Sequence, residues 1–279
     1  MFIKARSMRT AVLSLILLIA LLILILGMLR WGKQHVRKSI EMGVIGKSVS
    51  NITIIDVYDN VGFDPKFKIG FGFGCVVKLG NNTILFDTGG DSQTLLENLK
   101  VAGIKIEDIN IVVLSHIHGD HTGGLLGFLE KNPNVKVFIP KSFPQSFKEE
   151  IVSKGAEVIE VSEPTKIVEG VYSTGELGTL IKEQSLILDS TKGLVVITGC
   201  AHPGILNIVR RAKDLFNKEV YLVMGGFHYP PTTVAKELKK LGVKKVAPSH
   251  CTGEEAMKAL EEEYQEDFIR SGVGKVIEV

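Results

Sequence analysis

The sequence contains little cysteine, with three residues, Cys75, Cys200 and Cys251, in a chain of 279. Their number is odd and no two of them have CxxC spacing, which argues against a framework of disulfide bonds. Such cysteine usage is typical of a protein kept in a reducing compartment. We therefore expect the folded body of the chain to lie in the cytoplasm.

Acidic residues are absent from the first 40 positions, where seven of the 33 lysines and arginines lie. The remainder of the chain therefore carries 26 basic residues against 31 acidic ones. An acidic body lacks the positive field that attracts proteins to nucleic acid. This charge distribution argues against a nuclease, and we expect no nucleic-acid partner.

Polar residues are also nearly absent between positions 11 and 29, where Ser14 and Gly27 interrupt an aliphatic run. A helix rises about 1.5 Å per residue, so this run would nearly cross a bilayer core. Because no small-residue cleavage site follows the run, we predict a single-pass membrane anchor over 11–29. A basic flank over 1–10 precedes this anchor and a linker over 30–50 follows it. Bases on both sides leave the orientation open, and a later start at Met42 is the alternative.

Residues 51–279 are predicted to form one catalytic domain, since 45% hydrophobic residues can build a full core. Apolar runs rich in β-branched residues alternate with helix-like segments, which predicts an α/β layered fold. The predicted strands cover 52–57, 75–79, 83–86, 111–114, 135–139, 157–161, 186–188, 194–198, 220–224 and 245–247. The predicted helices cover 92–101, 123–131, 144–154, 205–216, 233–241 and 253–262.

A dense group of potential metal ligands follows the predicted strand over 111–114. Within six positions the chain presents His116, His118, Asp120 and His121. Imidazoles and carboxylates are ligands that Zn²⁺, Mn²⁺ and Fe²⁺ accept, and carboxylates also suit Mg²⁺. Alternation along the loop would let His116 and His118 point to one ion, while Asp120 and His121 serve a second. We therefore predict one or two divalent metal ions, which can hold a hydroxide or bind a phosphate.

Three more histidines follow predicted strands further along the chain. They are His202 in Gly-Cys-Ala-His, His228 in Gly-Gly-Phe-His and His250 in Ser-His-Cys. Any one of them alone could be a buried structural histidine, but beside a ligand cluster they are better explained together. We predict His202 and His250 as metal ligands, and we assign His228 to the substrate or to the surroundings of the ligands.

The HxHxDH run, the Asp87-Thr88-Gly89 turn and the late Ser249-His250 together resemble the metallo-β-lactamase superfamily. The segments ending in His202 and His228, Ser249-His250-Cys251-Thr252-Gly253 and the early Gly70-Phe71-Gly72-Phe73-Gly74 resemble one branch of it. That branch contains the archaeal synthases of methanopterin biosynthesis that join a pterin to a ribosylated aminobenzene. The resemblance covers about 51–279. It implies a four-layer αββα sandwich with metals at one edge, ligated by the first motif and His250.

The resemblance also implies a reaction. A synthase of this branch condenses a dihydropterin-6-methyl diphosphate with 4-(β-D-ribofuranosyl)aminobenzene 5′-phosphate and releases diphosphate. The substrate would then be a small phosphorylated molecule, and Asp120 or a bound hydroxide could take the amine proton. The alternative is a metal-dependent hydrolase of a phosphoester, thioester or lactone. Where hydrolases of the superfamily place a bridging aspartate, the chain has Cys200, either as a thiolate ligand or as a small buried residue.

Overall fold

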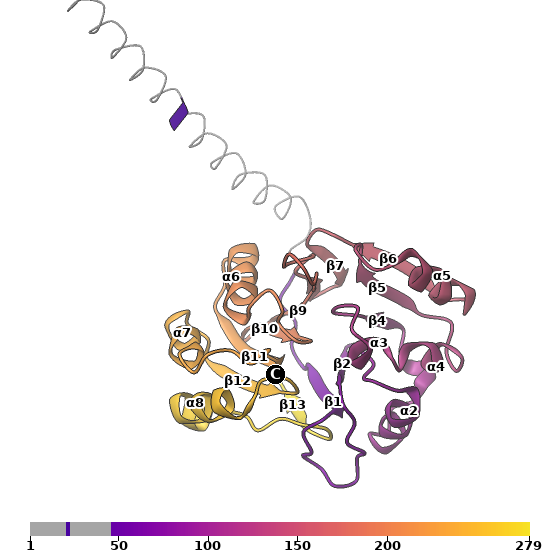
Figure 1. Ribbon diagram of the computed structural model, residues 1–279, viewed down its shortest axis with the longest axis horizontal. Coiled ribbons are helices and arrows are strands. Elements are labelled where there is room, and N and C mark those ends of the chain that lie inside the picture. The colour runs from indigo at the N-terminus through magenta and orange to yellow at the C-terminus, as the bar shows by residue number, and fades with distance from the viewer. Residues whose placement is uncertain (1–20, 23–45) are drawn as a thin grey trace, which may run out of the picture. The chain divides into compact units, whose positions relative to one another are not determined.

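The computed structural model describes residues 21–22 and 46–279, and residues 46–279 are one unit. Within this unit two sheets carry the fold (Figure 1). The first sheet has the order β13 (Val276–Glu278), β1 (Thr53–Asp59), β2 (Phe73–Leu79), β3 (Asn82–Phe86), β4 (Ile111–Val113), β5 (Lys136–Pro140) and β6 (Glu157–Val161). The second has the order β12 (Lys245–Ser249), β11 (Val220–Gly226), β10 (Gly193–Thr198), β9 (Leu186–Ser190), β8 (Val171–Ser173) and β7 (Thr165–Val168).

Helices cover the outer face of each sheet. The first sheet is covered by α2 (Ser92–Val101), α4 (Leu125–Leu129) and α5 (Gln145–Ser153), and the short α3 (Gly119–Thr122) lies beside β2. The second is covered by α6 (Ile205–Phe216), α7 (Val234–Lys240) and α8 (Glu254–Tyr264). Two single-turn 3₁₀ helices, Ile106–Asp108 and Gln265–Asp267, complete the elements. The layer order is therefore αββα, which confirms the predicted metallo-β-lactamase-type sandwich.

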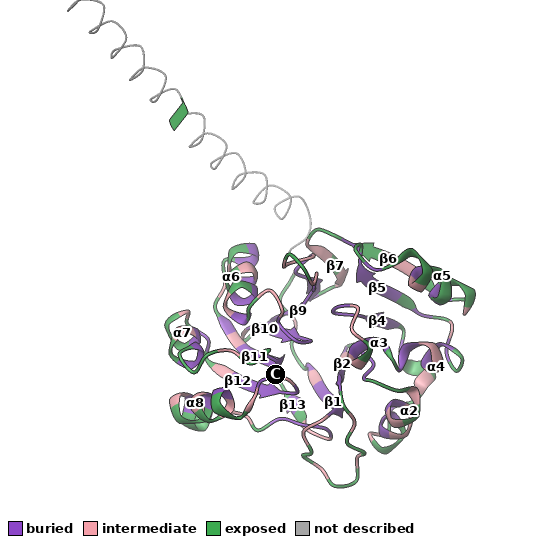
Figure 2. Ribbon diagram, viewed as in Figure 1, coloured by how far each residue is buried: buried purple, intermediate pink, exposed green. Residues whose placement is uncertain are grey.

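Both faces of the first sheet are buried, which explains why its strands are apolar at successive positions. In β2, Cys75 and Val77 face the core between the two sheets, whereas Val76 packs with the helical side. The core between the sheets also takes Val195 and Leu222 from the second sheet. Figure 2 shows that the strands are mainly buried and that the helices expose their outer faces. Strands of this kind are typical of sheets packed on both sides.

Local signals explain where several elements begin. The Asp91 side chain caps α2 by accepting a 2.8 Å hydrogen bond from the Thr94 N–H, which satisfies one free donor of the first turn. The helix α6 ends at Asn217, whose left-handed conformation closes the last turn. Strands β7, β8 and β13 were not predicted. They have only three or four residues, too few to show an alternation of apolar and polar positions.

The predicted membrane anchor over 11–29 is corrected by the structure. No helix among the residues described is long and apolar enough to cross a membrane. The predicted segment lies outside those residues except for Leu21 and Leu22. The predictions of a membrane partner and of a single-pass membrane localisation rested on this segment and are withdrawn with it.

Candidate metal centre

The chemistry-bearing loops leave the same edge of both sheets. Strands β3, β10, β11 and β12 end immediately before Asp87, Gly199, Phe227 and His250, respectively, and β4 ends two residues before Ser115. Because β3 and β4 are parallel, and β10, β11 and β12 are also parallel, their carboxyl ends meet at one edge of each sheet. Side chains that are far apart in the sequence are brought together there.

Two groups of donors form at this edge. Ligand atoms of His116, His118 and His202 lie within 4.8 Å of one another, as do those of Asp120, His121, His250 and Cys200. The structure thus brings together all six residues predicted as metal ligands, and adds the Cys200 thiol to the second group. His228 joins a third group with Cys200 and His202. The two main groups match the predicted division between two ions.

In four of the histidines a hydrogen bond at Nδ1 determines the tautomer of the imidazole. The Nδ1 atoms of His121 and His202 lie 2.8 and 2.9 Å from carboxylate oxygens of Asp87 and Glu183. A carboxylate can only accept, so each Nδ1 carries the proton. His250 Nδ1 likewise donates to the Asn60 side-chain oxygen at 2.6 Å.

The tautomer of His116 follows from Ser115. The Ser115 hydroxyl donates to Asp87 Oδ2 at 2.6 Å, and its oxygen therefore accepts from His116 Nδ1 at 2.9 Å. In all four imidazoles the lone pair is therefore on Nε2, where it can bind a cation. The fifth ring, His118, differs, because it is its Nδ1 that faces His116 Nε2, at 3.0 Å. His118 therefore presents Nδ1 to the same centre.

The donor set fits a cation. His250 Nε2 is buried without a hydrogen bond, although Asp120 Oδ2 lies 3.3 Å away. The same carboxylate oxygen lies 3.6 Å from His121 Nε2. Free imidazole lone pairs and an ionised carboxylate directed at a common point are the arrangement that divalent metals require. The residues present therefore fit the metal ions that the fold implies.

Electrostatics favour the protonation states that bind a cation at His116 and Asp120, whereas at His121 they favour the protonated ring. Burial and the neighbouring His121 lower the pKa of His116, which keeps this ring neutral and able to coordinate. Burial opposes ionisation of Asp120, but the His250 and His121 imidazoles lower the pKa of its carboxyl overall. Burial also acts against a charged His121, yet the adjacent Asp87 carboxylate raises the pKa of that ring.

Glu183 is a functional residue that the sequence reasoning missed. Its fully buried carboxylate accepts hydrogen bonds from the N–H groups of Cys200, Ala201 and His202 at 2.8 to 3.0 Å. It also accepts from the Thr198 hydroxyl at 3.0 Å and from His202 Nδ1. Burial would raise the pKa of Glu183, but these donors lower it overall. Glu183 precedes β9 in an irregular segment, and no motif marks it.

Two cysteines meet beside the ligands. Cys200 Sγ lies 3.2 Å from His121 Nε2 and 3.3 Å from Cys251 Sγ. The contact with Cys251 and burial raise the pKa of Cys200, whereas the same contact and the adjacent His250 lower the pKa of Cys251. Cys200 thus belongs to the donor group that would hold a second ion, and its neighbour Cys251 has the more acidic thiol.

Backbone strain is concentrated at this edge. Eight residues other than glycine have positive φ in the described part of the chain, and five of them lie in the site loops: Asp87, Ala201, His228, Tyr229 and His250. Such conformations cost about 1–3 kcal/mol each and persist where the surrounding structure imposes them. The strain is consistent with loops shaped to direct side chains at the metal centre.

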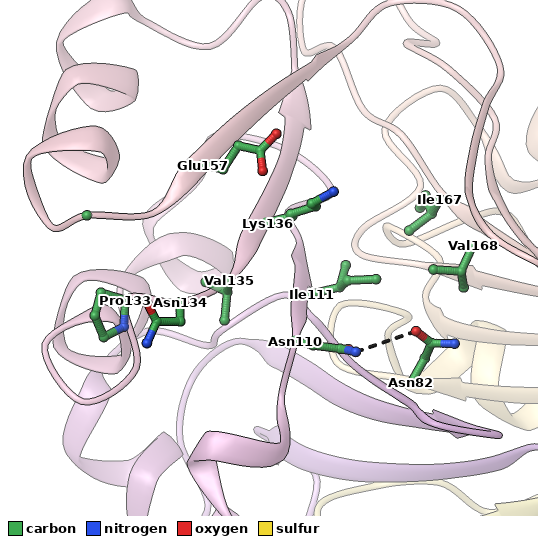
Figure 3. A pocket seen from close by; sticks show the side chains of 11 residues that line it. Asn82, Asn110, Ile111, Pro133, Asn134, Val135, Lys136, Glu157, Ile167 and Val168 are labelled. Atoms are coloured by element: carbon green, nitrogen blue, oxygen red, sulfur yellow. Dashed lines mark hydrogen bonds between the residues drawn. The ribbon is translucent and has the colours of Figure 1, made fainter.

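The pocket in Figure 3 lies elsewhere. Most of its lining residues lie at or before the amino-terminal ends of strands of the first sheet, among them Asn82, Asn110, Lys136 and Glu157. His116, His118 and His121 follow the opposite, carboxyl end of β4. In parallel α/β sheets ligands bind outside the carboxyl ends, so the metal edge is the candidate active site.

Comparison with known proteins identifies the family. A family model described as the metallo-beta-lactamase superfamily matches residues 70–250. The chain belongs to this superfamily, which confirms the resemblance drawn from the motifs. The fold of the superfamily implies divalent metal binding.

Individual relatives refine this assignment. The chain is 31% identical over 289 aligned positions to a 7,8-dihydropterin-6-methyl-4-(beta-D-ribofuranosyl)-aminobenzene-5′-phosphate synthase of Methanocaldococcus jannaschii, with 84% of this chain and 98% of the relative covered. It is also 31% identical to an uncharacterised protein of that organism, over 78% of this chain and 97% of the relative. A crystal structure of a metal-dependent hydrolase of the beta-lactamase superfamily superimposes with a TM-score of 0.68 at 27% identity, covering 82% of this chain and 99% of that one. Similarity to an enzyme over most of both chains supports an enzymatic role.

Proposed function

We propose that the chain is a metal-dependent transferase that condenses a dihydropterin-6-methyl diphosphate with 4-(β-D-ribofuranosyl)aminobenzene 5′-phosphate and releases diphosphate. The main support is the synthase of M. jannaschii, which is matched along 98% of its length at 31% identity. A match along almost the whole relative leaves no large domain of that synthase without a counterpart here. The proposal therefore concerns the complete reaction rather than one partial step.

In this proposal the metal centre acts on the leaving group. His116, His118 and His202 would hold one divalent ion, and Asp120, His121 and His250 a second. Ions bound there would neutralise the charge that develops on a departing diphosphate. The chain keeps these ligands oriented through Asp87 and Glu183, whose carboxylates fix the tautomers of His121 and His202.

A proton must leave the arylamine nitrogen as its bond to the pterin methylene carbon forms and the carbon–diphosphate bond breaks. Asp120 is a weak base for this purpose, because His250 and His121 lower the pKa of its carboxyl. His228 is exposed, and its ring centroid lies 4.3 Å from that of His202, at the side of the donor group. We therefore assign proton acceptance to His228 and metal binding to Asp120.

The test measures diphosphate release by the metal-loaded full chain, with and without the ribosylated aminobenzene phosphate. Release that requires the amine supports the transferase. Release without the amine would make the chain a hydrolase of the same fold, and no release in either condition would refute this substrate pair.

Two variants separate the roles of the histidines. In His228→Asn we expect kcat to fall about a hundredfold or more with metal content unchanged, because only the proton acceptor is lost. In His118→Ala we expect the metal content to fall together with activity. Loss of metal in the His228 variant would contradict its assignment as proton acceptor.

A further inference from the structure

Two aromatic side chains beside the metal centre are exposed to solvent. Phe71 and Tyr229 are 71% and 73% exposed, whereas their neighbours in the same glycine-containing segments, Phe73 and Phe227, are 0% and 2% exposed. Phe73 and Phe227 therefore serve the core. Packing in the core does not explain why Phe71 and Tyr229 are aromatic. Exposed aromatic rings are typical of binding surfaces.

The two exposed rings stand at opposite ends of the ligand group. The Phe71 ring centroid lies 5.7 Å from that of His250, and the Tyr229 centroid lies 6.4 Å from that of His228. Between these ends runs an unbroken row of imidazoles with centroid separations of 4.2 to 5.0 Å: His250, His121, His116, His202 and His228. Each ring therefore borders a different side of the centre.

Close backbone packing at two glycines holds the loop that carries Phe71 against the metal ligands. The neighbouring Gly72 has a φ of +142°, and a Cβ there would lie 2.1 Å from the backbone oxygen of Asp120. On the other side, a Cβ at Gly90 would lie 2.6 Å from the backbone oxygen of Phe71. The loop can approach the metal ligands this closely only because both positions are glycine.

Tyr229 is held by a comparable arrangement on the other side. Its φ is +47°, and its N–H donates to the backbone oxygen of Cys251 at 2.8 Å. A Cβ at Gly253 would lie 2.7 Å from the Tyr229 ring. A strained residue with an exposed ring is costly for folding, so its position points to a role in binding.

We propose that Phe71 and Tyr229 are two separate stacking platforms, each binding the planar ring of a different reactant at its own end of the metal centre. The inference rests on the proposed function, in which both reactants carry a flat ring, the dihydropterin and the aminobenzene. A hydrolase acting on one substrate would need only one such platform. Stacking on an aromatic side chain is tolerant of ring chemistry and favours flat π-systems.

The experiment uses the metal-loaded full chain and varies one substrate at a time. We expect Phe71→Ala and Tyr229→Ala each to raise KM about tenfold for one substrate, and for a different substrate in each variant. Metal content and kcat should stay within about twofold of the parent, because neither ring is a ligand or a proton acceptor. Phe71→Trp and Tyr229→Phe should restore KM.

Phe63→Ala is the matched control. Phe63 is also an exposed aromatic residue, 47% exposed, but its ring packs against the Lys275 ammonium, 4.5 Å from the ring centroid. Both KM values should therefore be unchanged in this variant. Unchanged KM values in both alanine variants, or an increase for the same substrate in both, would overturn the proposal.

Direct binding separates this proposal from the proposed function. The aminobenzene substrate and the dihydropterin alcohol that lacks diphosphate are titrated into the parent chain and the two alanine variants by calorimetry. If the parent releases no diphosphate, the transferase fails. The platforms are still supported if each substitution weakens binding of a different ring compound about tenfold. They are refuted if the parent binds neither compound or if the variants bind both as the parent does.

Discussion

Replacing Glu183 with glutamine tests whether a residue outside the ligand set controls metal affinity. Glutamine has nearly the same shape, but its amide group places N–H donors where one carboxylate oxygen accepted. If the amide nitrogen takes the position of Oε2, it faces the N–H and the Nδ1–H of His202, which now donate at 2.8 and 2.9 Å. The opposite orientation places it against the N–H groups of Cys200 and Ala201.

The expected losses of stability and of metal affinity follow from these contacts. At least two buried donors lose their acceptor in either orientation, at about 1–3 kcal/mol each, so the free energy of unfolding should fall by about 2–6 kcal/mol. In the first orientation His202 also loses the partner that fixes its tautomer, and loss of such a partner weakens metal binding about 10- to 100-fold. The loss of affinity corresponds to about 1.4–2.8 kcal/mol.

Metal affinity is measured by competition with a chromogenic chelator, and stability is measured by urea unfolding. Glu262→Gln is the matched control, because this glutamate on α8 has a 70% exposed side chain and lies 4.0 Å from Lys258. The control should match the parent in both assays. A Glu183→Gln variant that matches the parent in both metal affinity and stability would refute the role assigned to this carboxylate.

Three further predictions concern the ligands and a buried carboxyl pair. His118→Ala should abolish activity and lower metal content measured by atomic emission, and full activity would contradict the ligand set. Removal of metal by a chelator should lower the thermal midpoint, since bound metal stabilises the folded state by about 2.7 kcal/mol when its concentration is 100 times Kd. Burial and the Asp59 carboxylate raise the pKa of Asp56, so the folded chain keeps a proton that the unfolded chain loses above about pH 4. Its stability should therefore fall as the pH rises from there, and Asp56→Asn, compared by urea unfolding at about pH 5 and about pH 8, should remove that loss. An identical pH dependence in the variant would show that this carboxyl is not responsible.

Much of the fold was predictable because its strands and helices carry strong local patterns. The helices over 92–101 and 205–216 were predicted with the bounds of α2 and α6. Each presents one apolar face, α2 begins after the capping residue Asp91, and α6 ends at the left-handed Asn217. The short strands β7 and β8 were missed although each pairs with a strand next to it in the sequence, because three or four residues are too few to show an alternation. The apolar run over 11–29 led to a membrane prediction from length and hydropathy alone, and no described helix supports it.

The candidate site was predictable only in part, and the division has a physical reason. The HxHxDH run identifies four ligands because their spacing lies within one loop, and small residues before His202, His228 and His250 marked the others. Glu183 carries no such signal. Its role comes from the hydrogen bonds that it accepts from the loop after β10, more than a dozen residues away.

The sequence by itself determined the layered α/β class, the family and the kinds of ligand, because these depend on local periodicity and on motifs within short segments. Only the tertiary structure decided how the ligands divide into two groups, which nitrogen each imidazole presents, and which aromatic rings are exposed. Those properties depend on contacts between loops that meet at the sheet edge after long excursions of the chain. Four aromatic residues that look equivalent in the sequence thus become two core residues, Phe73 and Phe227, and two exposed rings, Phe71 and Tyr229.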